Sequence, residues 1–193
     1  MFGAMSLSAQ TTPQEWITAL NKSLGSRYAL GVTVVVGTGA ESTTLYGSIK
    51  VDGDAYYLML GNMEVYSDGK LRYEINNERK EVVEDRVNLE ACDLLSNPTR
   101  AFTFVPKEFS SEVVGRADSR VVVRLMPKSE AVGIDYIELT LEESGSKVLP
   151  VAICYDYDGD KVSIALAMAD AADAKLPCWS KSAYRAYDIV SFL

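Results

Sequence analysis

The side chains that most enzymes use for acid–base and nucleophilic chemistry are poorly represented in this chain, which contains no histidine. Serine–histidine–aspartate and cysteine–histidine nucleophile systems both need an imidazole, so the sequence predicts neither. Asp156, Asp158 and Asp160 alternate as acidic residues do in a calcium loop. Lys161 stands where that loop needs glycine and Ala167 where it needs a bidentate glutamate, so we interpret the segment as an acidic hairpin tip. The sequence therefore predicts no catalytic residue, no metal site and no cofactor.

The chain has three cysteines, Cys92, Cys154 and Cys178, whose wide spacing matches no zinc signature. Three thiols cannot all pair within one chain, and buried free thiols are the simplest expectation. A Cys154–Cys178 disulfide stays open as an alternative for an oxidising compartment.

Composition indicates one folded domain, because 193 residues with 48% apolar and 24% charged side chains are typical of a single globular unit. The net charge of −8, without a cationic cluster, disfavours nucleic acid as a partner. No run of about 18 apolar residues is present that would span a bilayer as a helix.

The chain opens with the apolar stretch MFGAMSLSAQ, which we interpret as the remnant of a secretion signal that lacks its basic start. The alternative is an irregular native N-terminus. Residues 1–10 are therefore expected to be a signal remnant, and residues 11–193 one domain.

Two kinds of hydrophobic periodicity indicate the elements of that domain. A capping box of Thr12 and Glu15, with Pro13 at the first helical position, predicts a helix whose apolar face packs on a sheet. From Arg27 onward the pattern alternates with a period of two, broken by short turns such as Asp158-Gly159, which predicts an antiparallel, strongly curved sheet. The apolar residues of the expected helical face are Trp16, Ile17, Leu20 and Leu24.

The strand rhythm is interrupted at residues 88–105. Leu89, Cys92 and Leu95 share a helical face, and Asn97-Pro98 is typical of a second helix start. We expect this helical insert to act either as a movable lid or as a plug of the core.

The order and spacing of several motifs resemble the LolA-like family of periplasmic outer-membrane lipoprotein carriers. These motifs are the strand Gly47-x-Ile49-x-Val51, an aromatic and apolar strand from Tyr56 to Leu60, the hairpin at residues 67–70, and Asn97-Pro98. The resemblance implies a mainly β fold with helices (α+β), in which a half-open antiparallel β-barrel of about 11 strands is covered by the N-terminal helix and a mid-chain helical lid.

The resemblance also implies a function. It implies a non-enzymatic periplasmic carrier, a monomer, that binds acyl chains of lipoproteins or lipids and delivers them to the outer membrane. Its implied partners are acylated lipoproteins or lipid, an inner-membrane lipoprotein-releasing transporter and an outer-membrane acceptor. We expect the acyl cavity to be lined by Ile49, Tyr56, Leu58, Tyr73, Ile75, Leu139, Ile153 and Leu166. We expect the lid to carry Leu94, Leu95, Phe102 and Phe104.

Two departures from the family pattern indicate a divergent member of the Bacteroidetes type. Asp52-Gly53 stands where classical members have an Arg-Pro pair, so no latch arginine is carried over, and the ending YRAYDIVSFL lacks the usual Asp-x-Arg. Two other classes stay open as alternatives. One is a structural or surface interaction module with a filled, sandwich-like core, and the other is a hydrolase with paired carboxylates in a cleft.

Overall fold

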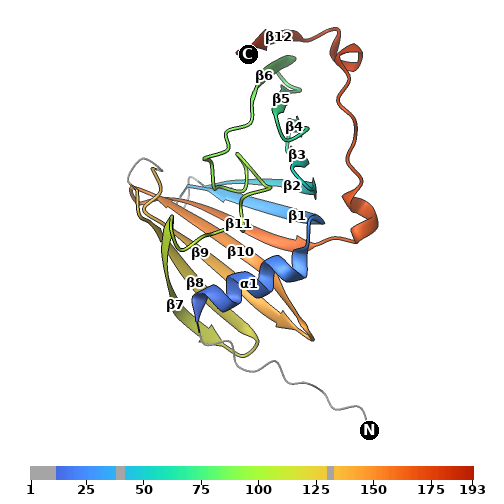
Figure 1. Ribbon diagram of the computed structural model, residues 1–193. Coiled ribbons are helices and arrows are strands. Elements are labelled where there is room, and N and C mark those ends of the chain that lie inside the picture. Colours follow the sequence, from blue (N-terminus) through green and yellow to red (C-terminus); the bar gives the residue numbers. More distant parts are fainter. Residues whose placement is uncertain (1–11, 38–41, 130–132) are drawn as a thin grey trace.

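A computed structural model describes residues 12–37, 42–129 and 133–193, and its dominant feature is one open, largely antiparallel sheet of twelve strands (Figure 1). The order of the strands is β12-β6-β5-β4-β3-β2-β1-β11-β10-β9-β8-β7. The strands are β1 (Arg27–Val36), β2 (Thr43–Asp52), β3 (Ala55–Leu60), β4 (Met63–Ser67), β5 (Leu71–Asn76), β6 (Glu81–Arg86), β7 (Phe109–Ala117), β8 (Arg120–Pro127), β9 (Tyr136–Ser144), β10 (Lys147–Tyr157), β11 (Asp160–Met168) and β12 (Asp188–Ser191).

The predicted mainly β architecture with an open, antiparallel sheet is confirmed in outline, with 12 strands where about 11 were expected. The two edges of the sheet are β7 and β12, and the sheet bends so that β2 to β6 stand away from the layer formed by β1 and β7 to β11 (Figure 1). The predicted hairpins are present, since β4 and β5 flank the turn at residues 68–70 and β10 and β11 flank Asp158-Gly159.

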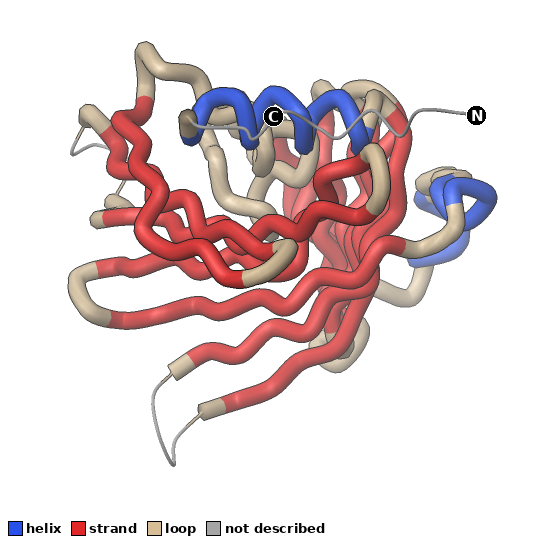
Figure 2. The backbone as a smooth tube through the Cα atoms, turned by 90° about the horizontal axis from the view of Figure 1, so that it is seen from below, coloured by secondary structure: helices blue, strands red, loops and turns tan. Residues whose placement is uncertain are grey.

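The predicted helix is also confirmed as α1 (Pro13–Leu24). The Thr12 side chain accepts from the Glu15 amide, and the Glu15 carboxylate accepts from the Thr12 amide at 2.9 Å, which completes the capping box. Its apolar face lies against β10 and β7 (Figure 2). The buried residues of that face are Trp16, Ile17, Leu20 and Leu24.

Residues 87–108, which we call the covering segment, form turns and irregular backbone, so the expected mid-chain helical lid is wrong. Short polar side chains explain the difference. The Asp93 carboxylate accepts from the amides of Leu95 and Ser96, and the Asn88 side chain accepts from the amide of Glu90. Such side-chain turns compete with the helical hydrogen bonds that the apolar spacing would otherwise favour.

Residues 169–187, which we call the C-terminal strap, cross the opposite face of the sheet before β12 pairs in parallel with β6 (Figure 1). The strap contains two short 3₁₀ helices, η3 (Ala171–Ala174) and η4 (Lys181–Tyr184). α1 and the covering segment therefore lie on one face of the sheet, and the strap covers part of the other face, where its rings contact Tyr66 of β4 and Tyr73 of β5.

Two sequence expectations concern the ends of the chain and its relation to membranes. The expected signal remnant at residues 1–10 lies outside the described residues. No helix in the part of the chain that the structure describes is long and apolar enough to cross a membrane.

Candidate functional site

The face of the sheet that α1 and the covering segment lie against, called the inner face, carries the main apolar core. Residues that sit directly opposite each other in paired antiparallel strands project to the same face. One such row runs through Leu30, Ile49 and Leu58, and another runs through Ile164, Ile153 and Leu139. All these side chains belong to one continuous buried cluster.

Six of the eight residues predicted to line an acyl cavity lie on this inner face. They are between 0% and 8% exposed, because α1 and the covering segment pack over them. Their grouping on one face is as expected, and their contact with a ligand stays a prediction. The six are Ile49, Tyr56, Leu58, Leu139, Ile153 and Leu166.

Tyr73 and Ile75 lie on the opposite, outer face, so the expectation that they share the cavity with the other six is wrong. The register of β4 and β5 places Arg72 and Glu74 on the inner face instead, opposite Ser67 and Val65. The sequence shows that Tyr73 and Ile75 share a face but not that the C-terminal strap covers that face. Tyr73 stacks on Trp179 of the strap with ring centroids 4.4 Å apart.

Arg72 and Glu74 form an ion pair of 2.7 Å on the inner face. The Arg72 Nε is buried and has no hydrogen-bond partner among the described residues. Sequence reasoning placed both side chains away from the interior, and the pair makes this end of the inner face partly polar.

The four predicted lid residues do lie on the covering segment, although the segment is not helical. Leu94, Phe102 and Phe104 are buried and Leu95 is half-buried. The Phe104 ring meets the Phe109 ring edge-on at 5.3 Å. The covering segment therefore fills the space over the inner face with its own apolar side chains.

Three tyrosines of the inner face, which we call the tether tyrosines, fasten the covering segment through their hydroxyl groups. Tyr28 donates to the Pro98 carbonyl at 3.0 Å and Tyr56 donates to the Ser96 carbonyl at 3.3 Å. The Tyr155 hydroxyl accepts from the Leu94 amide at 2.8 Å. Burial raises the pKa of all three phenols, so they stay protonated and able to hydrogen-bond at neutral pH.

The hydrogen bonds between the tether tyrosines and the covering segment were not predicted from the sequence. Sequence reasoning identified Tyr56 as a cavity residue, and the alternating pattern of β1 and β10 would have indicated that Tyr28 and Tyr155 point inward. Their partners lie 40 to 70 residues away along the chain, and a pattern of local spacing contains no signal for such contacts.

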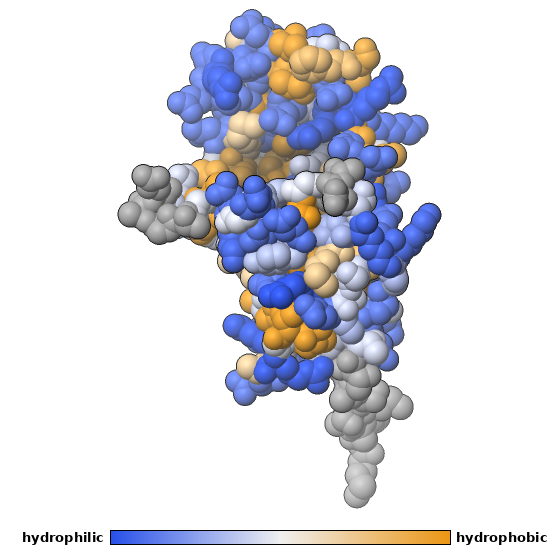
Figure 3. All heavy atoms as spheres, turned by 90° about the vertical axis from the view of Figure 1, so that its left-hand side faces the viewer, coloured by the Kyte–Doolittle hydropathy of each residue, from blue (hydrophilic) through white to orange (hydrophobic). Residues whose placement is uncertain are grey.

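One end of the inner face is incompletely covered. The ends of β1, β3, β8 and β10 and the starts of β2, β4, β9 and β11 meet there through antiparallel hairpins. At this end, called the open end, several apolar side chains remain half-buried and Val36 is 44% exposed. Figure 3 shows hydrophobic atoms in a recess on this side of the molecule. The half-buried residues are Leu45, Leu60, Met63 and Val162.

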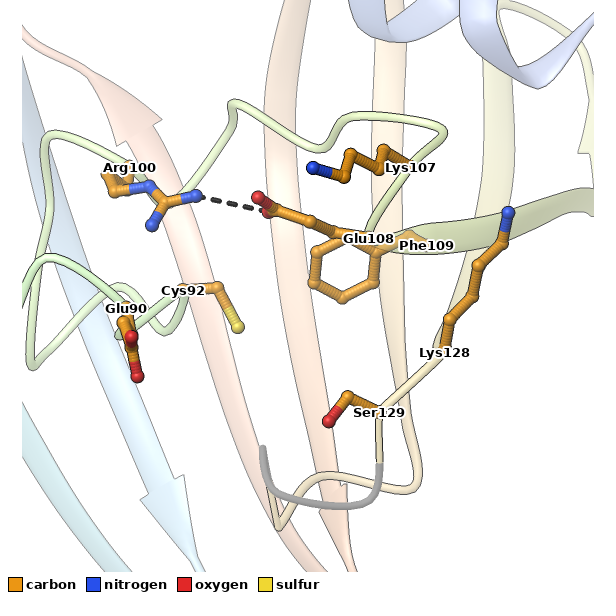
Figure 4. Close-up of a pocket in the computed structure, with 8 residues that line it drawn as sticks. All are labelled: Glu90, Cys92, Arg100, Lys107, Glu108, Phe109, Lys128 and Ser129. Atoms are coloured by element: carbon orange, nitrogen blue, oxygen red, sulfur yellow. Dashed lines mark hydrogen bonds and ion pairs between the residues drawn. The ribbon is translucent and has the colours of Figure 1, made fainter.

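A pocket of about 450 Å³ lies at the same end of the sheet, between the covering segment and the edge strands (Figure 4). Cys92 and Phe109 form its buried apolar walls, and the Cys92 thiol points toward its middle. A second hollow of about 330 Å³ adjoins it and shares Glu90, Cys92 and Ser129. We call the larger one the rim pocket; it is lined by Glu90, Cys92, Arg100, Lys107, Glu108, Phe109, Lys128 and Ser129.

The charged groups of the rim pocket differ in the hydrogen bonds and ion pairs that they form. Arg100 donates to Glu108 at 3.1 Å and also to the Leu89 carbonyl, and Lys128 donates to the Pro106 carbonyl at 2.7 Å. Within the described residues Lys107 forms no ion pair. Burial, and secondarily the neighbouring Asp93 carboxylate, raises the pKa of the Cys92 thiol, so the thiol is neutral at physiological pH.

The remaining residues with potential chemistry have structural partners. Asp156 accepts from the Gly159 amide at 3.0 Å and Asp135 accepts from the Asp158 amide at 2.9 Å, so these carboxylates stabilise the hairpin tip. All three cysteines are free thiols, and the alternative of a Cys154–Cys178 disulfide is therefore wrong.

The outer face holds an aromatic cluster that also escaped sequence reasoning. The Glu64 carboxylate accepts from the hydroxyls of Tyr57 and Tyr66 and from the Asn77 amide. Burial alone would raise the pKa of Glu64, but these hydrogen bonds outweigh it and lower the pKa below its usual value. Trp179 and Tyr184 of the C-terminal strap pack on this cluster and hold the strap to the sheet.

No family model and no curated protein matches this sequence. Among solved structures, an uncharacterized conserved protein from Thermus thermophilus is similar over 92% of this chain and 98% of its own, with a TM-score of 0.52 and 12% identity. A LolA superfamily protein from Nitrosomonas europaea is similar over 90% and 97%, with a TM-score of 0.44 and 9% identity. An outer membrane lipoprotein-sorting protein domain from Vibrio parahaemolyticus is similar over 81% and 88%, with a TM-score of 0.41 and 11% identity. This chain thus shares its fold with the Thermus protein.

Proposed function

We propose that the protein is a non-enzymatic carrier that binds an acyl chain of a lipoprotein or lipid between its inner face and its covering segment. One observation carries the proposal. The apolar inner face is covered by an irregular segment, which the hydroxyl groups of the three tether tyrosines hold in place. At the open end of the inner face, apolar side chains remain half-buried. A second sheet or a packed helix would make a permanent cover, whereas an irregular segment can move aside without the loss of regular secondary structure.

The energetics of transfer favour this kind of site. Each buried methylene contributes about 0.8 kcal/mol, so an acyl chain leaves a membrane only for a comparably apolar enclosure. When the chain displaces the covering segment, apolar surface of the inner face stays buried, because one apolar occupant replaces another. The inner face thus supplies an enclosure for the ligand and is itself covered when the carrier is empty.

The wider setting of the proposal follows from the sequence resemblance. It comprises a periplasmic location, loading by an inner-membrane lipoprotein-releasing transporter, delivery to an outer-membrane acceptor and a monomeric carrier. The net charge of −8 fits this setting, since loading cannot then depend on attraction to anionic head groups of a bilayer surface.

A second candidate is a structural or interaction module with a filled core. The observation in its favour is that the six inner-face residues predicted to line a cavity are already buried by the protein's own side chains. The two candidates differ in whether the covering segment yields to an acyl chain.

Binding of a long-chain fluorescent fatty acid to a matched pair of variants tests the proposal. Val162 is half-buried on the inner face at the open end, whereas the next residue, Ser163, is exposed on the outer face. Val162→Glu is expected to weaken binding at least about tenfold, equivalent to the lost burial of two methylenes, while Ser163→Glu leaves binding unchanged. These positions are more informative than Leu58, which is 3% exposed in the core and where a buried charge would unfold the protein.

Absence of fatty-acid binding in the parent protein would favour the filled-core module. Equal binding by both variants would show that the acyl chain lies elsewhere. Mass spectrometry of the protein after incubation with spheroplasts then distinguishes triacylated lipoprotein cargo from free lipid.

A further inference from the structure

The rim pocket has features that the burial of an acyl chain does not need. Three of its lining side chains, Arg100, Lys107 and Lys128, are cationic and two, Glu90 and Glu108, are anionic, in a protein whose net charge is −8. Arg100 is paired with Glu108, so Lys107, Lys128 and Glu90 are the remaining charged groups of the lining. The lining therefore has one more cationic than anionic side chain, on a protein of negative net charge.

The inner walls of the rim pocket are apolar. Cys92 and Phe109 are both members of the apolar core cluster and are 6% and 5% exposed. The pocket thus opens to solvent among lysines and ends against the apolar core. Its volume of about 450 Å³ lies within the range of about 300 to 1,000 Å³ that is typical of sites for small organic molecules.

The position of the pocket relates it to the half-buried apolar residues. Lys128 follows the end of β8, and Val162 lies near the start of β11, three strands further along the same end of the sheet. Three strand spacings of about 4.8 Å give about 14 Å, which matches the roughly 15 Å that one acyl chain spans in half of a bilayer core. A head group in the rim pocket would therefore place its chain along the open end as far as Val162.

We propose that the rim pocket binds the anionic head group, a carboxylate or a phosphate, of a singly acylated amphiphile whose chain follows the open end of the inner face. Lys107 and Lys128 supply the cationic hydrogen-bond donors, and Cys92 and Phe109 contact the first methylenes. The inference rests on the proposed function, because it names the ligand class of the same acyl site.

A comparison of two ligands of equal chain length tests this inference separately from acyl binding itself. A long-chain fatty acid is expected to bind about tenfold more tightly than the corresponding fatty alcohol, because only the acid forms charge-assisted hydrogen bonds with the lysines. The preference should shrink when ionic strength rises from about 0.01 M to about 0.15 M. A lysophosphatidic acid of the same chain length, compared with the fatty acid, distinguishes a phosphate from a carboxylate ligand.

Substitutions of the lysines test whether the preference for fatty acid over fatty alcohol arises in the rim pocket. Lys107→Gln combined with Lys128→Gln should reduce fatty-acid affinity to that of the alcohol, and Lys107→Gln alone should remove part of the preference without touching the Lys128–Pro106 contact. The matched control is Lys70→Gln with Lys147→Gln, two exposed lysines that line none of the described hollows.

The outcomes separate the two proposals. Equal affinity for acid and alcohol overturns the head-group inference and leaves the carrier function standing. A preference that survives in the lysine variants overturns the assignment to the rim pocket. Failure of both ligands to bind refutes the carrier function, and the head-group inference with it.

Discussion

Removal of two tether hydroxyls should free the covering segment without a change in the shape of the core. In Tyr28→Phe with Tyr155→Phe, the buried rings remain while the bonds to the Pro98 carbonyl and the Leu94 amide are lost. Each net hydrogen bond contributes about 1 kcal/mol, so the pair contributes about 2 kcal/mol, and the population with the covering segment detached should rise about 30-fold. That population is the one that admits an acyl chain under the carrier proposal.

The Cys92 thiol reports this opening directly. It lies in the covering segment, is 6% exposed, and has a raised pKa because it is buried, so it should react with an alkylating reagent only when the segment detaches. We expect its alkylation rate at constant pH to rise about 30-fold in the double variant. The exposed Cys178 gives an internal reference, since its reaction needs no opening.

Two controls separate local opening from global unfolding. Tyr46→Phe changes a tyrosine that is 70% exposed and should leave the Cys92 rate unaltered. Low urea concentrations should hardly affect Cys92 alkylation if the opening is local, because a small opening exposes little surface. If the Cys92 rate instead follows the global unfolding equilibrium at every urea concentration, the covering segment is an inseparable part of the core and the reasoning fails.

Two further substitutions test how the sheet is held together. Gly47→Ala should lower the unfolding free energy by about 3 kcal/mol, because the added Cβ would lie 1.9 Å from the Met59 carbonyl oxygen, a backbone atom that cannot move aside. Gly31→Ala is the control, because the nearest atom to its added Cβ is 3.9 Å away. Equal urea midpoints for the two variants would contradict the geometry. The lowered pKa of Glu64 means that its carboxylate stabilises the fold above the ordinary glutamate value of about 4.3 and that this contribution disappears as the pH falls through the folded value. The melting temperature of the parent protein should therefore exceed that of Glu64→Gln at pH 7 and approach it near pH 3, and a difference independent of pH would refute the role of the charge.

The parts of the fold that local chemistry determines were predictable from the sequence. The capping box of Thr12 and Glu15 located α1, and strict alternation with turn residues located the strands and hairpins. Apolar spacing was misleading at Leu89, Cys92 and Leu95, because Asp93 and Asn88 turn the backbone where a helix would need continuous hydrogen bonds.

The candidate site was only partly predictable because a period of two distinguishes two faces without identifying the inner one. On β5 the apolar residues Tyr73 and Ile75 lie on the outer face. The C-terminal strap, more than a hundred residues later in the chain, covers Tyr73 there. The tether tyrosines and the rim pocket likewise depend on contacts between distant segments. Only the assembled sheet brings the covering segment beside the end of β8.

The strand order also has a consequence for how the chain acquires its structure. Eleven of the twelve strands form two meanders, β1 to β6 and β7 to β11, in which each strand pairs with its neighbour along the chain. Antiparallel neighbours joined by short turns need little loop closure, so each meander can assemble early. The two are joined where β1 pairs with β11, at Leu30 with Met168 for instance, and β1 and β11 are separated by more than a hundred residues. We therefore expect this seam to be the slow step of folding, and substitutions there should lower the refolding rate more than equally destabilising ones within either meander.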